Sequence, residues 1–191
     1  MDSVLIPRDL LVAMTVICRR VSRSLDLALH SEWSDLKSYF KSLDFRIYQF
    51  ALKEMKSLLP QPDEEFDPTL PDPPSWIIAL KSRLMFEFRG QISIPSTETR
   101  WIAGSLEHGL RLVQMEVRPG DQEIVTGRTR LAQSEYLLGR RIPKAIAQQA
   151  ERVQHFNAPS HLTMIPMEEF LRRHAPRYLD RAGQSGFAGR G

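Results

Sequence analysis

A proline-rich acidic segment at residues 60–75 is the strongest constraint on the fold of this 191-residue chain. Its sequence is PQPDEEFDPTLPDPPS. No helix can pass through it, because a proline inside a helix removes a backbone hydrogen bond and clashes with the preceding turn. Its clustered carboxylates also repel one another. We therefore predict an acidic linker at residues 60–75, between a helical hairpin at residues 1–59 and a compact basic domain at residues 76–182.

The first part of the chain has helical periodicity. Residues 8–30 carry apolar side chains at three- and four-residue steps, which is typical of a helix with a buried face. A second helix is expected to begin at Ser31, because acidic residues follow it where the helix dipole is positive. Its apolar stripe continues to Leu58. The two helices are expected to form an antiparallel hairpin, although one long bent helix fits the same pattern.

A small β element is predicted in the middle of the chain. After a short helix at residues 76–83, apolar and polar residues alternate from Phe86 to Ile94, which is the period of a strand. Gly90 is expected to mark a bend or bulge, and Pro95 to end the strand.

Two interpretations fit residues 96–126. Ser96 and Thr97 indicate the start of a helix, and Gly109 stands where a residue that ends a helix is expected. The preferred continuation is a β-hairpin at residues 111–126, turning at Pro119 and Gly120. The alternative is one longer helix over residues 97–117.

The last third is predicted to be helical. One helix ends at Gly139, a second begins at Pro143 and a third begins at Pro166. The glycine-rich tail at residues 183–191 is expected to be disordered. The predicted fold class is therefore mainly α, with α+β possible and a small central β element.

Basic residues are concentrated in the second half of the chain. Residues 100–191 carry fourteen lysines and arginines against nine acidic residues, and thirteen of the fourteen are arginine. The planar, permanently charged guanidinium suits forked contacts with phosphates and carboxylates. This excess predicts an anionic partner, RNA or another single-stranded nucleic acid. The alternative is a solvated face with Glu135 and Glu151 as local partners.

Two groups of cations are the candidates for contacting nucleic acid. The first lies on two predicted helices and their connection: Arg128, Arg130, Arg140, Arg141, Lys144 and Arg152. The second forms an auxiliary arm: Arg172, Arg173 and Arg177. A helix-turn-helix interpretation of residues 128–155 would offer Lys144, Gln148, Gln149 and Arg152 to base edges. Tyr136, His155 and Phe156 could stack on bases where they are exposed.

The apolar stripe of the second helix is a candidate surface for self-association. It contains Trp33, Leu36, Phe40, Ile47 and Phe50. The segment EWSDLKSYFKSLDF, through Trp33, Leu36, Phe40 and Phe45, resembles the first core helix in coat proteins of rod-shaped plant viruses. The resemblance is confined to this segment and implies a viral structural or accessory role, but the rest of the chain does not follow that pattern, so no family is assigned.

Motifs for catalysis and cofactor binding do not stand out. The lone cysteine, Cys18, lies in an apolar run, and the five histidines have no zinc spacing. We expect no cofactor, no metal and no membrane span, and a cytoplasmic or nuclear location. The leading prediction is a non-enzymatic, oligomerising accessory protein that binds RNA or single-stranded nucleic acid. The alternative is a protein–protein adaptor with an acidic partner, using the N-terminal helices or the proline-rich segment. The third is an enzyme with an unrecognised site.

Overall fold

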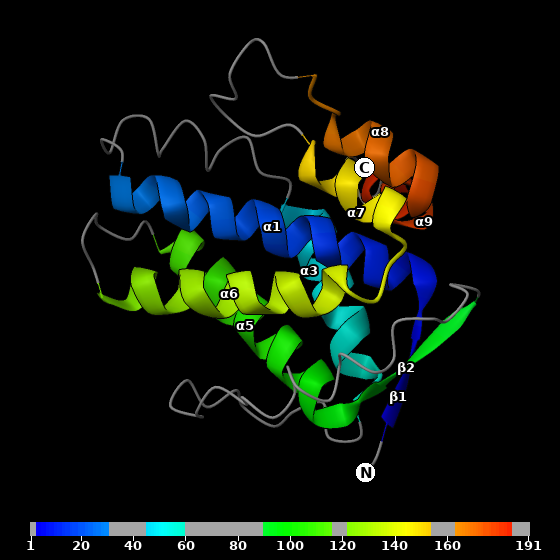
Figure 1. Ribbon diagram of the computed structural model, residues 1–191, viewed down its shortest axis with the longest axis horizontal. Coiled ribbons are helices and arrows are strands. Elements are labelled where there is room, and N and C mark those ends of the chain that lie inside the picture. Colours follow the sequence, from blue (N-terminus) through cyan, green and yellow to red (C-terminus); the bar gives the residue numbers. More distant parts are fainter. Residues whose placement is uncertain (1–2, 31–44, 60–89, 116–121, 154–162, 185–191) are drawn as a thin grey trace, which may run out of the picture.

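Figure 1 shows the computed structural model of this chain, which is mostly helical with one two-stranded antiparallel sheet. This confirms the predicted fold class. The structure describes residues 3–30, 45–59, 90–115, 122–153 and 163–184, and the statements below concern these residues. The elements are β1 Ser3–Pro7, α1 Arg8–His30, α3 Phe45–Ser57, β2 Gln91–Pro95, α5 Ser96–Gln114, α6 Gln122–Gly139, α7 Lys144–Glu151, α8 Met167–His174 and α9 Arg177–Gln184.

Helix α1 lies at the centre of the fold. Every residue from Leu10 to Cys18 is buried. A helix that is apolar on all sides requires neighbours on all sides, and α1 packs against α3, α5, α6, α7 and α8 (Figure 1). The prediction of a helix over residues 8–30 is confirmed.

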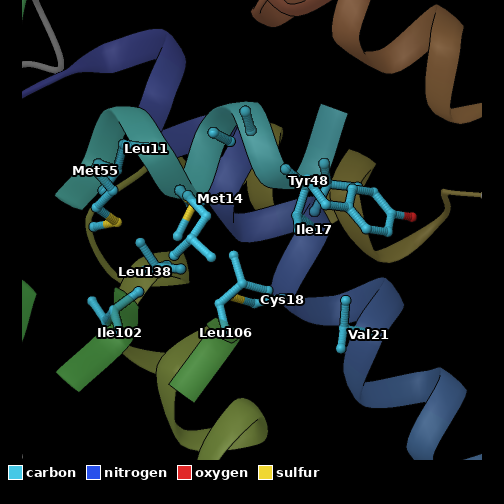
Figure 2. Close-up of a cluster of buried hydrophobic side chains, with 14 of the residues drawn as sticks. Leu11, Met14, Ile17, Cys18, Val21, Tyr48, Met55, Ile102, Leu106 and Leu138 are labelled. Carbon is cyan, nitrogen blue, oxygen red and sulfur yellow. The ribbon is translucent and has the colours of Figure 1, made fainter. Parts of the chain in front are cut away.

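The main core forms where α1 meets α3, α5 and α6 (Figure 2). Burying one large apolar side chain contributes about 1.5–3 kcal/mol relative to exposing it, so this cluster holds the four helices together. Figure 2 labels Leu11, Met14, Ile17, Cys18 and Val21 from α1, Tyr48 and Met55 from α3, Ile102 and Leu106 from α5, and Leu138 from α6.

Two buried glycines bring α5 and α6 close to each other and to α1. A Cβ at Gly109 of α5 would collide with Leu131 of α6 and lie 3.1 Å from Val21 Cγ1 of α1. A Cβ at Gly127 of α6 would lie 2.6 Å from Leu112 Cδ1 of α5. The missing side chains therefore make room for their neighbours at this seam.

The sheet holds the start of α1 beside the start of α5, because β1 precedes α1 and β2 precedes α5. Strand β1 pairs antiparallel with β2, with Ser3 opposite Pro95 and Pro7 opposite Gln91. Gly90 precedes β2 with φ +68°, in the left-handed region that favours glycine. The bend at Gly90 and the end of the strand at Pro95 are confirmed, whereas the sequence pattern does not predict β1.

Five of the described helices, α1, α5, α7, α8 and α9, begin directly after a proline. Pro95, Pro143 and Pro166 have φ between −52° and −56° and ψ between 136° and 141°, and they precede α5, α7 and α8. The residue before a helix needs such extended backbone angles, and proline is already restricted in φ. The predicted starts at Pro143 and Pro166 and the predicted helix end at Gly139 are confirmed.

The predicted β-hairpin at residues 111–126 is wrong. Helix α5 continues through Gly109 to Gln114, and α6 begins at Gln122. The alternative of one longer helix, expected over residues 97–117, describes this region better. Gly109 does not end a helix, because its role is close packing inside α5.

Some predictions concern residues outside the described ranges. These are the start of the second helix at Ser31, the linker at residues 60–75 and the short helix at residues 76–83. Helix α9 is not predicted by the sequence pattern and includes the first two residues of the expected disordered tail. The division into separate units stays a prediction, although helices from either side of the linker share one core.

Candidate functional site

The predicted nucleic-acid-binding cations divide into those with partners inside the protein and those facing solvent. Arg141 belongs to the first kind. Its Nε and Nη2 donate to Glu98 Oε1 at 2.9 Å and Oε2 at 2.6 Å. Only 10% of the Arg141 side chain and 3% of the Glu98 side chain are exposed. This forked ion pair joins the connection after α6 to the first turn of α5.

Arg177 also faces inward, at the junction of α9 with α1 and α3. Its Nε and Nη2 donate to the Asp9 carboxylate at 2.6 and 2.9 Å, and its Nη1 donates to Glu54 Oε1 at 2.6 Å. The Tyr178 hydroxyl donates to the other oxygen of Glu54 at 2.7 Å. The bonds to Asp9 raise the pKa of Arg177, and burial, followed by the bond to Glu54, raises the pKa of Tyr178. This network fastens α9 to the start of α1.

Three further predicted cations contact side chains within the fold. Arg130 is buried, with its guanidinium carbon 5.2 Å from the centre of the Trp101 ring. Arg128 forms an ion pair with Asp26 of α1, and Arg173 forms one with Glu169 one turn earlier in α8. Both of these pairs are partly exposed.

Three predicted cations face solvent. Lys144, Arg152 and Arg172 are exposed, and none forms an ion pair with a described residue. Lys144 and Arg152 are eight positions apart, with exposed Gln148 midway between them. Residues four apart lie one above another on a helix, so Lys144 and Gln148 of α7 and Arg152, which directly follows its last residue, form a polar row. We call this row the α7 face.

The buried side of α7 fixes the orientation of this row. Ile146, Ala150 and Val153 are buried in the core. Gln149 Oε1 lies 2.7 Å from His174 Nε2 of α8, and the Ile165 amide donates to the Arg152 carbonyl at 2.7 Å. Arg172 lies on α8 and is therefore carried on an element joined to α7.

Arg140 and Tyr136 form an exposed pair at the end of α6. Arg140 Nη1 donates to the Tyr136 hydroxyl at 2.6 Å, and its guanidinium carbon lies 5.2 Å from the centre of the tyrosine ring. Tyr136 is 49% exposed. Residues 136–150 contain no acidic residue, so no local carboxylate neutralises Arg140 or Lys144 within this stretch.

The predicted self-association stripe lies partly outside the described residues. Trp33, Leu36 and Phe40 fall there. Ile47 is buried in the core, and half-buried Phe50 packs edge-on against Tyr178 with ring centres 5.6 Å apart. Self-association stays a prediction.

Two ionisable groups in the core, the Cys18 thiol and the His108 imidazole, have pKa values shifted toward their neutral forms. Burial, followed by the charge of Glu135, raises the pKa of the Cys18 thiol, which makes it a poor nucleophile. Burial, followed by Arg111 and Arg130, lowers the pKa of His108. In the described part of the chain, no three His, Cys, Asp or Glu side chains are grouped to hold a metal ion, and no helix there has the length and apolarity needed to cross a membrane.

The sequence did not predict the acidic partners of Arg128, Arg141 and Arg177. Glu98 carries a recognisable signal, because it precedes Ile102 and Leu106 at four-residue steps and so lies on the buried side of α5. Asp9, Glu54 and Asp26 carry no comparable signal. Glu135, expected to be a local partner of nearby arginines, instead pairs with Arg19 of α1.

The chain was compared with known proteins in three ways. Neither a scan against protein-family models nor searches of curated proteins and of solved structures returned a match. We therefore infer function from the geometry of this chain alone.

Proposed function

We propose that this chain is a non-enzymatic protein that binds nucleic acid through the α7 face. The observation that carries this proposal is that Lys144 at the start of α7 and Arg152 directly after its end are exposed and make no ion pair with a described residue. A cation without an acidic partner can neutralise a phosphate and release its counterions at no cost to an internal contact.

The composition of the α7 face also suits a nucleic acid. Lys144 and Arg152 are about 12 Å apart along the helix axis, and Gln148 lies between them. Charged groups at the two ends can contact phosphates, while an amide between them can donate to or accept from a base edge. Arg140 precedes α7 in the chain, and Arg172 lies on α8, which a hydrogen bond between Gln149 and His174 joins to α7.

The proposed group of contact residues is smaller than the nine-residue set predicted from the sequence. Arg130, Arg141 and Arg177 are assigned to holding helices together, because each is buried or bonded to groups on other helices. The contact group becomes Lys144, Arg152 and Arg172, with Arg140 at its edge. A buried cysteine thiol is consistent with a reducing location, and we propose the cytoplasm or nucleus.

The experiment is binding of a fluorescein-labelled single-stranded RNA across a salt series. The variant is Lys144→Ala/Arg152→Ala, and the matched control is Lys53→Ala/Arg111→Ala, which removes two exposed cations from α3 and α5. We expect wild type and control to share one steep slope of log affinity against log salt. The α7 variant should bind more weakly, with a slope shallower by about 1.4 for two lost phosphate contacts.

Two results would contradict the proposal. One is no binding by wild type at low salt. The other is equal weakening in the α7 variant and the control, which would show that only total charge matters.

A protein partner is the second candidate, because one side of α6 is exposed and only weakly polar. Val125 and Tyr136 are 39% and 49% exposed, and Thr129 and Ala132 between them are exposed at near four-residue spacing. Aromatic and arginine side chains contribute much of the binding energy at protein interfaces. Loss of a copurifying protein on Val125→Glu, with RNA binding unchanged, would support this function.

A further inference from the structure

We infer that the nucleic acid is single-stranded and that one of its bases stacks on the Tyr136 ring. This inference rests on the proposed function, and the experiment below separates the two. It follows from the position of Tyr136, the contact that Arg140 makes with it, and the distance from both to the α7 face.

Tyr136 is exposed where comparable side chains are buried. Tyr48 and Tyr178, the other two described tyrosines, are 0% and 1% exposed, whereas Tyr136 is 49% exposed. Aromatic rings normally contribute to stability by leaving water. About half of the surface of Tyr136 stays in water, so its ring remains able to pack against a partner.

Arg140 holds the ring in one orientation. The hydrogen bond to the hydroxyl and the guanidinium over the ring, at 2.6 Å and 5.2 Å, restrain both ends of the side chain. A restrained ring loses less conformational entropy when a base binds it. The guanidinium also adds a positive charge beside the stacked base, where the adjacent phosphate would lie.

Apart from the Arg140 guanidinium over the ring, the neighbour of the Tyr136 side chain one helical turn earlier is small. A helical side chain covers the turn before its own Cα, so the Tyr136 ring lies over the turn that contains Ala132 and Gln133. Ala132 is exposed and small, and Gln133 is half-buried. The side chain one turn before Tyr136 is therefore too short to cover the ring.

The spacing fits one continuous strand. Arg140 and Lys144 are four residues apart, so their Cα atoms are separated by at most about 14 Å. Lys144 and Arg152 are about 12 Å apart along α7. A strand of a few nucleotides can therefore place one base on Tyr136 and its following phosphates on Lys144 and Arg152. A duplex keeps its bases stacked inside, so it could not use the ring in this way.

The experiment compares a labelled ten-nucleotide RNA with the same strand carrying abasic residues and with its duplex. The proteins are wild type, Tyr136→Ala and Tyr136→Phe, with Lys144→Ala/Arg152→Ala as the phosphate-contact variant. We expect Tyr136→Ala to weaken binding of the intact single strand by about 5- to 150-fold. Tyr136→Phe should keep most of the affinity, because the phenyl ring still stacks. The abasic strand should bind all three Tyr136 forms equally.

The possible results separate base stacking on Tyr136 from nucleic-acid binding itself. Equal affinity of wild type for the intact, abasic and duplex RNA would overturn base stacking. If the Lys144→Ala/Arg152→Ala variant still lost affinity, the proposed function would remain. If neither intact nor abasic RNA bound wild type at low salt, both would be rejected. Urea unfolding of Tyr136→Ala, expected to show a folded protein under the binding conditions although the half-buried ring is lost, excludes misfolding as the cause.

Discussion

Arg141 and Glu98 form a forked, buried ion pair, with N–O distances of 2.9 and 2.6 Å, between the α6–α7 connection and the first turn of α5. The preceding residue, Arg140, stacks on exposed Tyr136 instead. Two adjacent arginines that look equivalent in the sequence therefore have different roles. One holds the fold together, and the other belongs to the candidate interface.

Replacing Arg141 should destabilise the protein. Arg141→Ala leaves the Glu98 carboxylate buried without its partner, and breaking such a pair costs about 3–5 kcal/mol. Arg140→Ala is the matched control and should change the free energy of unfolding by no more than about 0.5 kcal/mol, because Arg140 lies at the surface. Urea unfolding monitored by circular dichroism measures both. Unchanged stability of Arg141→Ala together with weaker RNA binding would return Arg141 to the phosphate-contacting group.

The Arg177 network should require the guanidinium itself. Arg177→Lys keeps the positive charge but cannot bond Asp9 through two nitrogens and Glu54 through a third. We expect a loss of about 1–3 kcal/mol and faster amide exchange in α9 and in the first turn of α1. Hydrogen exchange read by mass spectrometry locates the effect. Arg172→Lys, at an exposed position on α8, should leave exchange unchanged, and equal exchange in wild type and Arg177→Lys would refute the role given to the network.

The helices were predictable to the extent that their signals are local. Helix α1 follows from its periodicity, and α7 and α8 follow from the prolines before them. Strand β1 lacks such a signal, because five residues become a strand only by pairing with β2, with Ser3 opposite Pro95. The region after Gly109 was misread because a glycine needed for tight packing looks the same in sequence as a glycine that ends a helix.

The site was less predictable than the fold for a related reason. An arginine-rich sequence does not show which arginines meet acids inside the fold. Glu98 is 43 positions from Arg141, and Asp9 is 168 positions from Arg177. Only the tertiary structure separates these inward cations from Lys144 and Arg152.

His108 should make the protein less stable in acid. Burial lowers its pKa in the folded state, so below about pH 6.5, the ordinary histidine value, the unfolded chain binds more protons than the folded one. Stability therefore falls as the pH drops, by at most about 1.4 kcal/mol per pH unit for one proton. His108→Gln should flatten this dependence between pH 7.5 and 5, measured from urea midpoints.

His174 contributes with the same sign, because burial, followed by Arg8 and Arg173, lowers its pKa as well. The stability of the double variant His108→Gln/His174→Gln should therefore depend less on pH than the stability of either single variant. A pH dependence that all three variants share with wild type would show that other groups cause the acid sensitivity.

Gly109 should tolerate a methyl group poorly, although it lies inside a helix. Gly109→Ala places a Cβ against Leu131 and 3.1 Å from Val21 Cγ1, so these close-packed side chains must shift to make room for it. Overpacking costs about 1–3 kcal/mol, which outweighs the roughly 1 kcal/mol by which alanine favours a helix over glycine. Gly139→Ala is the matched control, since nothing lies within 4 Å of its added Cβ, and it should be neutral or slightly stabilising. Thermal unfolding of both variants measures the difference, and a Gly109→Ala variant as stable as Gly139→Ala would show that α5 and α6 do not need this glycine for their close approach.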